Sequence, residues 1–190
     1  MAPGINTPGA FLLILLTCRV PSLTGSQCVI LGAVMYFATV LLLMLVLPVV
    51  SVISEAVFAG NADLLFLVGK WFVFWGVGLR LLLAGLKQVA QPSFTAEKIF
   101  GVTDEKAFPL VQEIGFGNLS IGLLGAASLF QPNWVVPAAL VGCIFFGLAG
   151  LKHLTQPSRN RNETVAMLSD IGISTVLAIY LVAHVLTFAA

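Results

Sequence analysis

The sequence predicts an all-α fold, namely an integral membrane helical bundle with five transmembrane helices. Hydrophobic residues make up 59% of the 190 residues, charged residues make up 9%, and the mean hydropathy is +1.05. Soluble domains contain about 45–50% apolar and about 25% charged residues, so this chain is typical of a protein whose surface faces lipid. No run of about ten residues alternates between apolar and polar side chains, which argues against a transmembrane barrel. The net charge of +1 gives no case for nucleic-acid binding.

Five apolar stretches are each long enough to cross about 30 Å of hydrocarbon, which takes roughly 20 helical residues. They are residues 29–53, 64–86, 110–130, 134–151 and 165–188. Each should be helical, because a single apolar span can satisfy its backbone hydrogen bonds only internally. No span is clearly broken at its centre. We expect residues 1–28 to be a disordered or interfacial tail, so that the bundle comprises residues 29–190.

The long loop between the second and third spans contains several local signals. Ser93 to Gly101 can form a short interfacial helix that turns Ile99 toward lipid, with Gly101 as its stop. Thr103 is placed to cap the third helix. Pro109 is expected to bend that helix where it enters the bilayer.

Basic residues in the loops predict the orientation. Seven of the nine Lys and Arg residues lie in segments that face one side of the bundle, while loops 54–63 and 131–133 contain none. The seven are Arg19, Lys87, Lys98, Lys106, Lys152, Arg159 and Arg161. Positively charged short loops stay on the cytoplasmic side. We therefore expect the N-terminus in the cytoplasm and the C-terminus outside.

Three charged residues lie well inside the predicted spans. An ionisable side chain at the bilayer centre costs about 2.5–3.5 kcal/mol on insertion scales, so each one needs an explanation. Arg80 lies six residues from the end of its span, roughly 9 Å deep. Glu113 and Asp170 enter from the same side on two other helices and reach a similar depth.

The face of the second helix that carries Arg80 indicates what the arginine meets. Helical spacing places Arg80 on a stripe of mostly small residues, which are Gly69, Val73, Gly76, Ala84 and Lys87. The third helix has a small stripe of its own, which is Gly115, Asn118, Gly122, Gly125 and Ala126. Small residues let helices approach closely in membranes. We therefore predict that the second and third helices pack together and that Arg80 faces Glu113.

The candidate site is a cluster of polar residues near one membrane face: Arg80, Lys87, Glu113, Asn118, His153 and Asp170. Three interpretations of this cluster are open. An Arg–Glu pair can simply hold the helices in register. Arg80 and Lys87 can bind a small polar or anionic headgroup, or Glu113 or Asp170 can handle protons.

Other polar and aromatic residues of the spans have simpler explanations. Lys70 and His184 lie near the opposite membrane face and are expected to reach the interface there. Trp71 and Trp75 fall on the other side of the second helix from Arg80, facing lipid or a partner protein. Cys143 lies mid-span and is expected to be a small apolar filler.

At FPLVQEIGFGNLSIGLLG (residues 108–125) the chain resembles an uncharacterised family of bacterial integral membrane proteins, a domain of unknown function. Members carry a Glu-x-Gly-Phe-x-Asn-Leu pattern, matched here by Glu113, Gly115, Phe116, Asn118 and Leu119. They also have a histidine ending the next helix, an asparagine in the loop and an aspartate in the last helix. These match His153, Asn160 or Asn162, and Asp170. The resemblance covers about residues 64–186, implies a bacterial inner (plasma) membrane, and carries over no catalytic residue.

More distantly, RLLLAGLK (residues 80–87) followed by Glu113 is similar to the DoxX-like four-helix membrane proteins. That resemblance implies a four-helix core with one added N-terminal helix. Some DoxX-like proteins associate with quinone-linked sulfur oxidation or oxidative-stress complexes. This chain departs from them in having the further helix in front and no cysteine pair.

The function expected from these features is that of an accessory or structural subunit of a membrane complex. No nucleophile–base pair or metal-binding spacing is evident, so an enzyme is the less favoured class. The alternatives are a small-ligand or quinone-binding protein linked to redox chemistry and a small proton or solute transporter. No cofactor is evident; the candidates are a quinone, whose headgroup carbonyl could accept a hydrogen bond from Arg80 or His153, and a pigment, for which no motif is present. The expected partners are the lipid bilayer and other membrane proteins, with no nucleic acid.

Overall fold

The computed structural model describes residues 34–59, 63–156 and 161–189, and within these ranges the chain forms helices and short turns without a strand. Five helices are long and apolar enough to cross a membrane: Val34–Phe58, Leu64–Ala90, Glu105–Ala127, Pro132–Leu154 and Arg161–Thr187. The prediction of an all-α membrane bundle with five spans is confirmed. The expected tail, residues 1–28, lies outside the described residues.

Each span is built from one or more helical elements. The first contains η1 (Leu42–Val46) and α3 (Leu47–Ala59), and the second contains α4 (Leu64–Phe72), η2 (Val73–Leu79) and α5 (Arg80–Ala90). The third contains η4 (Glu105–Ala107) and α6 (Phe108–Ala127), and η3 (Phe94–Ile99) lies in the loop before it. The fourth contains η5 (Pro132–Trp134) and α7 (Val135–Leu154), and the fifth is α8 (Arg161–Ala189).

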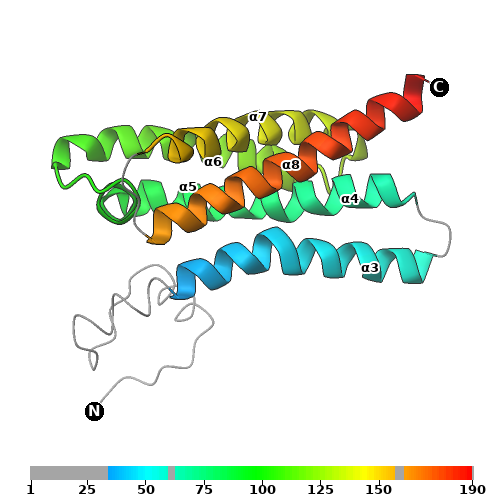
Figure 1. Ribbon diagram of the computed structural model, residues 1–190, viewed down its shortest axis with the longest axis horizontal. Coiled ribbons are helices and arrows are strands. Elements are labelled where there is room, and N and C mark those ends of the chain that lie inside the picture. Colours follow the sequence, from blue (N-terminus) through cyan, green and yellow to red (C-terminus); the bar gives the residue numbers. More distant parts are fainter. Residues whose placement is uncertain (1–33, 60–62, 157–160, 190) are drawn as a thin grey trace, which may run out of the picture.

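Spans two to five form a four-helix core, and the first span lies against its outside (Figure 1). Within the core α5 packs on α6, α7 packs on α8, and α4 contacts α8. The first span contacts α4 and η2. The largest side chains buried at the centre include Phe146, Leu177 and Tyr180. This arrangement matches the expected core of four helices with one helix added in front.

Glycines allow the second and third spans to touch backbone to backbone. A Cβ atom on Gly122 of α6 would lie 2.6 Å from the backbone nitrogen of Leu82. A Cβ on Gly78 of η2 would lie 2.6 Å from the backbone nitrogen of Ala126. Real Cβ atoms do not approach other atoms so closely, so only glycine fits at these crossings. The predicted packing of these two spans through their small residues is therefore confirmed.

The second span is not a regular α-helix throughout. Its middle, η2, is a wider π-helical turn, which the sequence did not predict. Such turns arise from one extra residue in the helix and often occur at functional sites. Here η2 ends directly before Arg80, and Gly76 and Gly78 within it are buried. The turn therefore changes the direction in which the residues after it project.

The first helix is attached to the core by hydrogen bonds to Glu55. This carboxylate accepts hydrogen bonds from Lys70 Nζ at 2.8 Å and from Trp71 Nε1 at 2.7 Å. Trp75 Nε1 donates to Ser51 Oγ at 3.0 Å. The expectation that the two tryptophans face lipid or another protein is therefore wrong, because their indole N–H groups bond to the chain's own first helix.

Glu55 was expected in a loop, but α3 continues through it to Ala59. Two polar residues in a row, Ser54 and Glu55, are typical of the end of a span. Here the helix can continue because Lys70 and Trp71 of α4 donate hydrogen bonds to the Glu55 carboxylate. Lys70 likewise forms an ion pair instead of extending alone to the interface. A single-span hydropathy pattern does not reveal a charge pair formed between two spans.

We expect Glu55→Ala to loosen the first helix, because the change removes the acceptor for Lys70 and Trp71. The pair is partly exposed, so the free energy of unfolding should fall by about 1–2 kcal/mol. Titration with SDS in mixed micelles, followed by circular dichroism, measures this loss. The matched control is Ser54→Ala at the exposed neighbouring position, where the change should stay below about 0.5 kcal/mol. Equal losses in both variants would contradict the attachment through Glu55.

The loop before the third span differs from its prediction in three places. Asp104, not Thr103, caps the turn η4 by accepting a hydrogen bond from the Lys106 backbone N–H at 2.9 Å. Pro109 sits in the first turn of α6, where a proline needs no hydrogen-bond partner, so it starts the helix and does not bend it. The predicted short helix exists as η3, with Gly101 at a φ of 69° after it, but Ile99 is buried.

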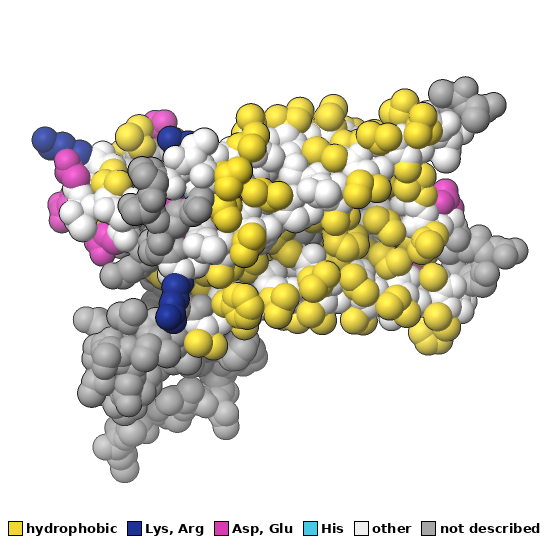
Figure 2. Space-filling view, viewed as in Figure 1, with side chains coloured by type: hydrophobic (Ala, Val, Ile, Leu, Met, Phe, Trp, Pro, Cys, Tyr) yellow, Lys and Arg dark blue, Asp and Glu magenta, His cyan; other side chains and the backbone are white. Residues whose placement is uncertain are grey.

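Charged side chains gather at one end of the molecule, beyond a band of apolar side chains (Figure 2). We call this the basic end, and it carries Lys87, Lys106, Lys152 and Arg161. There α5 and α7 end and α6 and α8 begin. The same residues carry the predicted cytoplasmic orientation, which stays a prediction.

Candidate functional site

An ion pair between Arg80 and Asp170 joins α5 to α8 inside the bundle. Arg80 Nη2 donates to Asp170 Oδ1 at 2.7 Å and to Ser169 Oγ at 3.0 Å. Only 12% of the arginine side chain and 8% of the aspartate side chain are exposed. Both charges are therefore largely removed from solvent and lipid, where an unpaired charge would be most costly.

Small and aromatic residues of α7 shape the surroundings of this pair. A Cβ on Gly150 would lie 2.7 Å from Ile171 Cγ1 and 3.4 Å from Asp170 Cβ, so this glycine lets α8 approach α7 beside the aspartate. The Phe146 ring lies against the guanidinium, with Arg80 Cζ 4.7 Å from the ring centroid. We call Arg80, Phe146, Ser169 and Asp170 the Arg80 cluster.

The predicted pairing of Arg80 with Glu113 is wrong. Glu113 is exposed on α6 and forms none of the ion pairs found among the described residues. It lies two residues before Gly115, and two residues turn a helix by about 200°. Since Gly115 is buried against α5, Glu113 points away from the second span. The direction in which Glu113 projects thus differs from the prediction, because it depends on the rotation of α6 about its axis.

A second polar pair lies nearer the basic end. His153 Nδ1 of α7 is 3.3 Å from Glu163 Oε1 of α8, and these side chains are 11% and 8% exposed. His153 is also within electrostatic reach of Asp170. The sequence placed His153 at the rim and Glu163 in a loop, whereas both are buried between helices. Glu163 and Asp170 are seven residues apart, which puts them on one helix face. This spacing could have indicated that Glu163 is also buried in the bundle.

Asn118 and Lys87 lie in other surroundings. Asn118 Nδ2 donates to Gln88 Oε1 at 2.7 Å, which links α6 to α5 at a buried position. Gln88 was not among the predicted site residues. It follows Arg80 by eight residues, or roughly 12 Å along the helix. Lys87 Nζ lies 3.6 Å from the centroid of the Phe94 ring in η3. The structure thus brings Arg80 and Asp170 together and places His153 beside Glu163. The other predicted site residues, which are Asn118, Lys87 and Glu113, lie outside both pairs.

One nitrogen of the arginine has no hydrogen-bond partner in the described part of the chain. Arg80 Nη1 is buried and makes no hydrogen bond to any described residue, as is also true of Asn118 Oδ1. A buried N–H group without an acceptor is costly, and the cost is greater for a charged group. The other guanidinium nitrogen, Nη2, is already fixed by Asp170 and Ser169. The Arg80 cluster therefore offers a buried nitrogen with two N–H groups that have no acceptor among the described residues.

Beyond the Arg80 cluster the buried centre of the bundle is mostly apolar, although Ser174 of α8 donates a hydrogen bond to the Cys143 backbone oxygen at 2.9 Å. Farther along the same face of α8, Ile173 is 2% exposed and Leu177 is completely buried. Its surroundings are apolar and include Val73, Val77 and Ile173. Polar side chains thus extend from the basic end to Arg80 and Asp170 and then give way to an apolar core.

Metal ligation finds no support in the described part of the chain. No group of three or more His, Cys, Asp or Glu side chains there could hold a metal ion. Cys143 packs between α7 and α8, with its Sγ 3.5 Å from the backbone oxygen of Ser174. Its environment agrees with the expected role as a small filler.

The model of a family of unknown function, DUF6790, matches residues 30–190. The chain belongs to this family. The match includes all five spans and both polar pairs described above. No curated protein and no solved structure matches the chain.

Membership in DUF6790 confirms the resemblance to a family of unknown function, and it covers the first span as well as residues 64–186. The more distant similarity to DoxX-like proteins and the bacterial inner membrane stay predictions. The five apolar helices make the protein a multi-pass membrane protein. The function of the family is unknown. The Arg80 cluster is the feature of the chain that suggests a function.

Proposed function

We propose that this DUF6790 protein is a membrane-embedded binding protein for the carbonyl-bearing headgroup of a small lipid-soluble molecule, such as a quinone. The observation that carries the proposal is the buried Nη1 of Arg80, which has no acceptor among the described residues. A carbonyl oxygen is the acceptor that a guanidinium N–H lacks here, and a lipid-soluble ring can reach it without crossing water.

The immobility of the arginine supports this assignment. Asp170 and Ser169 hold Nη2, and Phe146 lies over the guanidinium plane, so the direction of Nη1 is fixed before any ligand arrives. A donor fixed in advance costs less ordering on binding than a free side chain. Because Nη1 is buried, a ligand has to displace a neighbouring side chain, and the Phe146 ring, which lies against the guanidinium, is a candidate.

The two functions that compete with this proposal have less support. The tryptophans bond to the first helix of the chain itself. The small stripes pack the second span against the third. Neither feature therefore supports a partner subunit. A transporter needs a polar route, and the core around Leu177 is apolar. A partner subunit and a transport function therefore stay predictions that rest on the sequence alone.

The proposal is tested by binding of decylubiquinone to the purified protein in nanodiscs, with empty nanodiscs as the background. The decisive variant carries Arg80→Gln together with Asp170→Asn, because this change removes both charges and the guanidinium at once and leaves two uncharged polar side chains. We expect its affinity to fall roughly 10- to 150-fold, the range for losing a hydrogen bond from a charged donor.

The matched control is Glu113→Gln, which removes a charge at an exposed position outside the cluster. It should bind decylubiquinone as the unaltered protein does. Circular dichroism verifies that each variant is folded. Unchanged affinity in a folded double variant, or no saturable binding by the unaltered protein, would overturn the proposal.

A further inference from the structure

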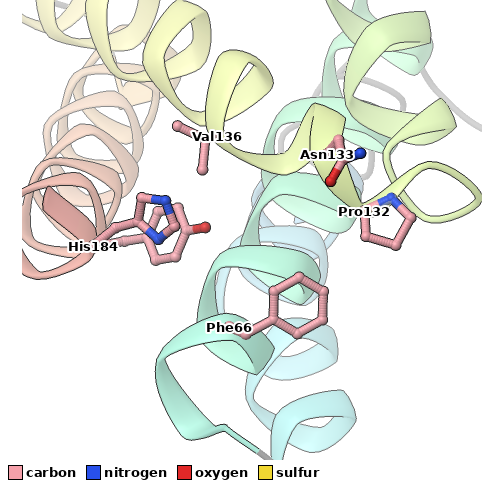
Figure 3. Close-up of a pocket in the computed structure, with 6 residues that line it drawn as sticks. Phe66, Pro132, Asn133, Val136 and His184 are labelled. Atoms are coloured by element: carbon pink, nitrogen blue, oxygen red, sulfur yellow. The ribbon is translucent and has the colours of Figure 1, made fainter. Parts of the chain in front are cut away.

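A hollow lies between helices at the end of the bundle opposite the basic end (Figure 3). Its volume is about 320 Å³, near the lower limit of the range of about 300–1,000 Å³ for small-molecule pockets. Its lining comes from α4, η5, α7 and α8, and consists of Phe66, Pro132, Asn133, Val136, Tyr180 and His184. No residue of the Arg80 cluster takes part in it.

The lining combines an apolar wall with polar groups on two sides. Figure 3 shows Phe66 and Val136 between the polar side chains, with His184 on one side and Asn133 on the other. Tyr180 lies beside His184, with ring centroids 5.8 Å apart and the ring planes tilted by 32°. A flat molecule placed here would contact apolar side chains along its body and polar groups at its edges.

The position of Tyr180 is built into the packing of the bundle. A Cβ atom on Gly69 of α4 would collide with the Tyr180 ring, so a glycine is required where this ring crosses. The tyrosine residue is only 2% exposed, although it borders the hollow. A buried tyrosine hydroxyl needs a hydrogen-bond partner, which makes it a natural contact for a ligand in the hollow.

The chemistry of the lining selects the kind of ligand. Phenol, carboxamide and imidazole groups can all donate or accept hydrogen bonds, and none carries a fixed charge. The carboxylate of Asp63 accepts a hydrogen bond from the backbone N–H of Phe66, a lining residue, at 3.3 Å, so its negative charge lies near the hollow and opposes an anion. A charged ligand would also lose its hydration among the apolar side chains. The lining therefore favours a neutral molecule with few polar atoms.

We propose that this hollow is a second binding site, which takes a neutral aromatic ring bearing a hydroxyl or carbonyl group. The ring lies against Phe66 and Val136, and its polar group bonds to Tyr180, His184 or Asn133. The site is separate from the Arg80 cluster and does not depend on the function proposed for that cluster.

The test uses para-fluorophenol as the probe and fluorine NMR as the readout, with the full-length protein in nanodiscs. We expect line broadening that saturates with probe concentration and exceeds the broadening in empty nanodiscs. Tyr180→Phe keeps the ring and removes the hydroxyl, so it should weaken this binding roughly five- to tenfold. Val136→Phe fills the hollow and should abolish the saturable broadening.

Two controls separate this site from general effects. Ile179→Phe adds the same bulk at a 65% exposed position of α8 and should leave binding unchanged. The double variant Arg80→Gln, Asp170→Asn should also bind the probe normally, which distinguishes this site from the Arg80 cluster. Broadening that does not saturate, or that stays the same in folded Val136→Phe protein, would overturn the proposal and indicate simple partition into lipid.

Discussion

Arg80→Ala alone is expected to lower the free energy of unfolding by about 3–5 kcal/mol, because it leaves the buried carboxylate of Asp170 without its partner. The double variant Arg80→Met, Asp170→Leu should be close to the unaltered protein or more stable. It removes both charges and fills the space with apolar side chains, which is often neutral or stabilising for a buried ion pair. SDS titration in mixed micelles measures all three proteins.

A third variant identifies the acid that pairs with the arginine. Arg80→Met combined with Glu113→Leu leaves Asp170 unpaired, so it should be as unstable as Arg80→Met alone. If Glu113 were the partner, as the sequence suggested, this combination would restore stability and the Asp170 combination would not. The two double variants therefore distinguish the observed pair from the predicted one in a single experiment.

The same variants connect stability with function. A pair that only holds helices in register can be replaced by apolar residues without loss of binding. The proposed headgroup site predicts a different result, in which Arg80→Met, Asp170→Leu folds normally and fails to bind decylubiquinone. Comparing its unfolding curve with its binding curve thus separates a structural role of Arg80 from a binding role.

Much of the fold was predictable because hydropathy and length determine which segments can cross a membrane. The small stripes also predicted correctly that the second and third spans pack together, since glycines on both faces allow close approach. Charge pairing between spans was harder to predict. It depends on the rotation of each helix about its axis, and the π-helical turn η2 shifts that rotation just before Arg80.

The candidate site was therefore predicted in part. The depth of Arg80, Asp170 and His153 pointed to a polar cluster near one membrane face. The partner predicted for Arg80 was wrong, and Glu163, the partner of His153, was not predicted. The expected packing of the second span on the third favours Glu113 as the ion-pair partner of Arg80. In the structure the arginine instead pairs with Asp170 of the fifth span. Glu163 was missed because it lies in a polar segment that resembles a loop, although it is the first acidic residue of α8.

A second large effect is expected at the crossing of α5 and α6. Gly122→Ala places a methyl group 2.6 Å from the Leu82 backbone nitrogen and 3.0 Å from the Gly78 backbone oxygen. Backbone atoms in the middle of helices cannot move aside individually, so the two helices have to separate. Overpacking of this kind costs about 1–3 kcal/mol, and the loss should appear as an earlier transition in SDS titration.

Gly117→Ala is the matched control on the same helix. A Cβ at Gly117 has no atom within 4 Å, so the added methyl group meets no obstacle. Alanine favours a helix over glycine by up to about 1 kcal/mol, and this variant should therefore be as stable as the unaltered protein or more stable. Opposite signs for two identical substitutions five residues apart can arise only from the contact that each glycine makes. Similar losses at both positions would mean that the packing of α5 on α6 is looser than the structure describes.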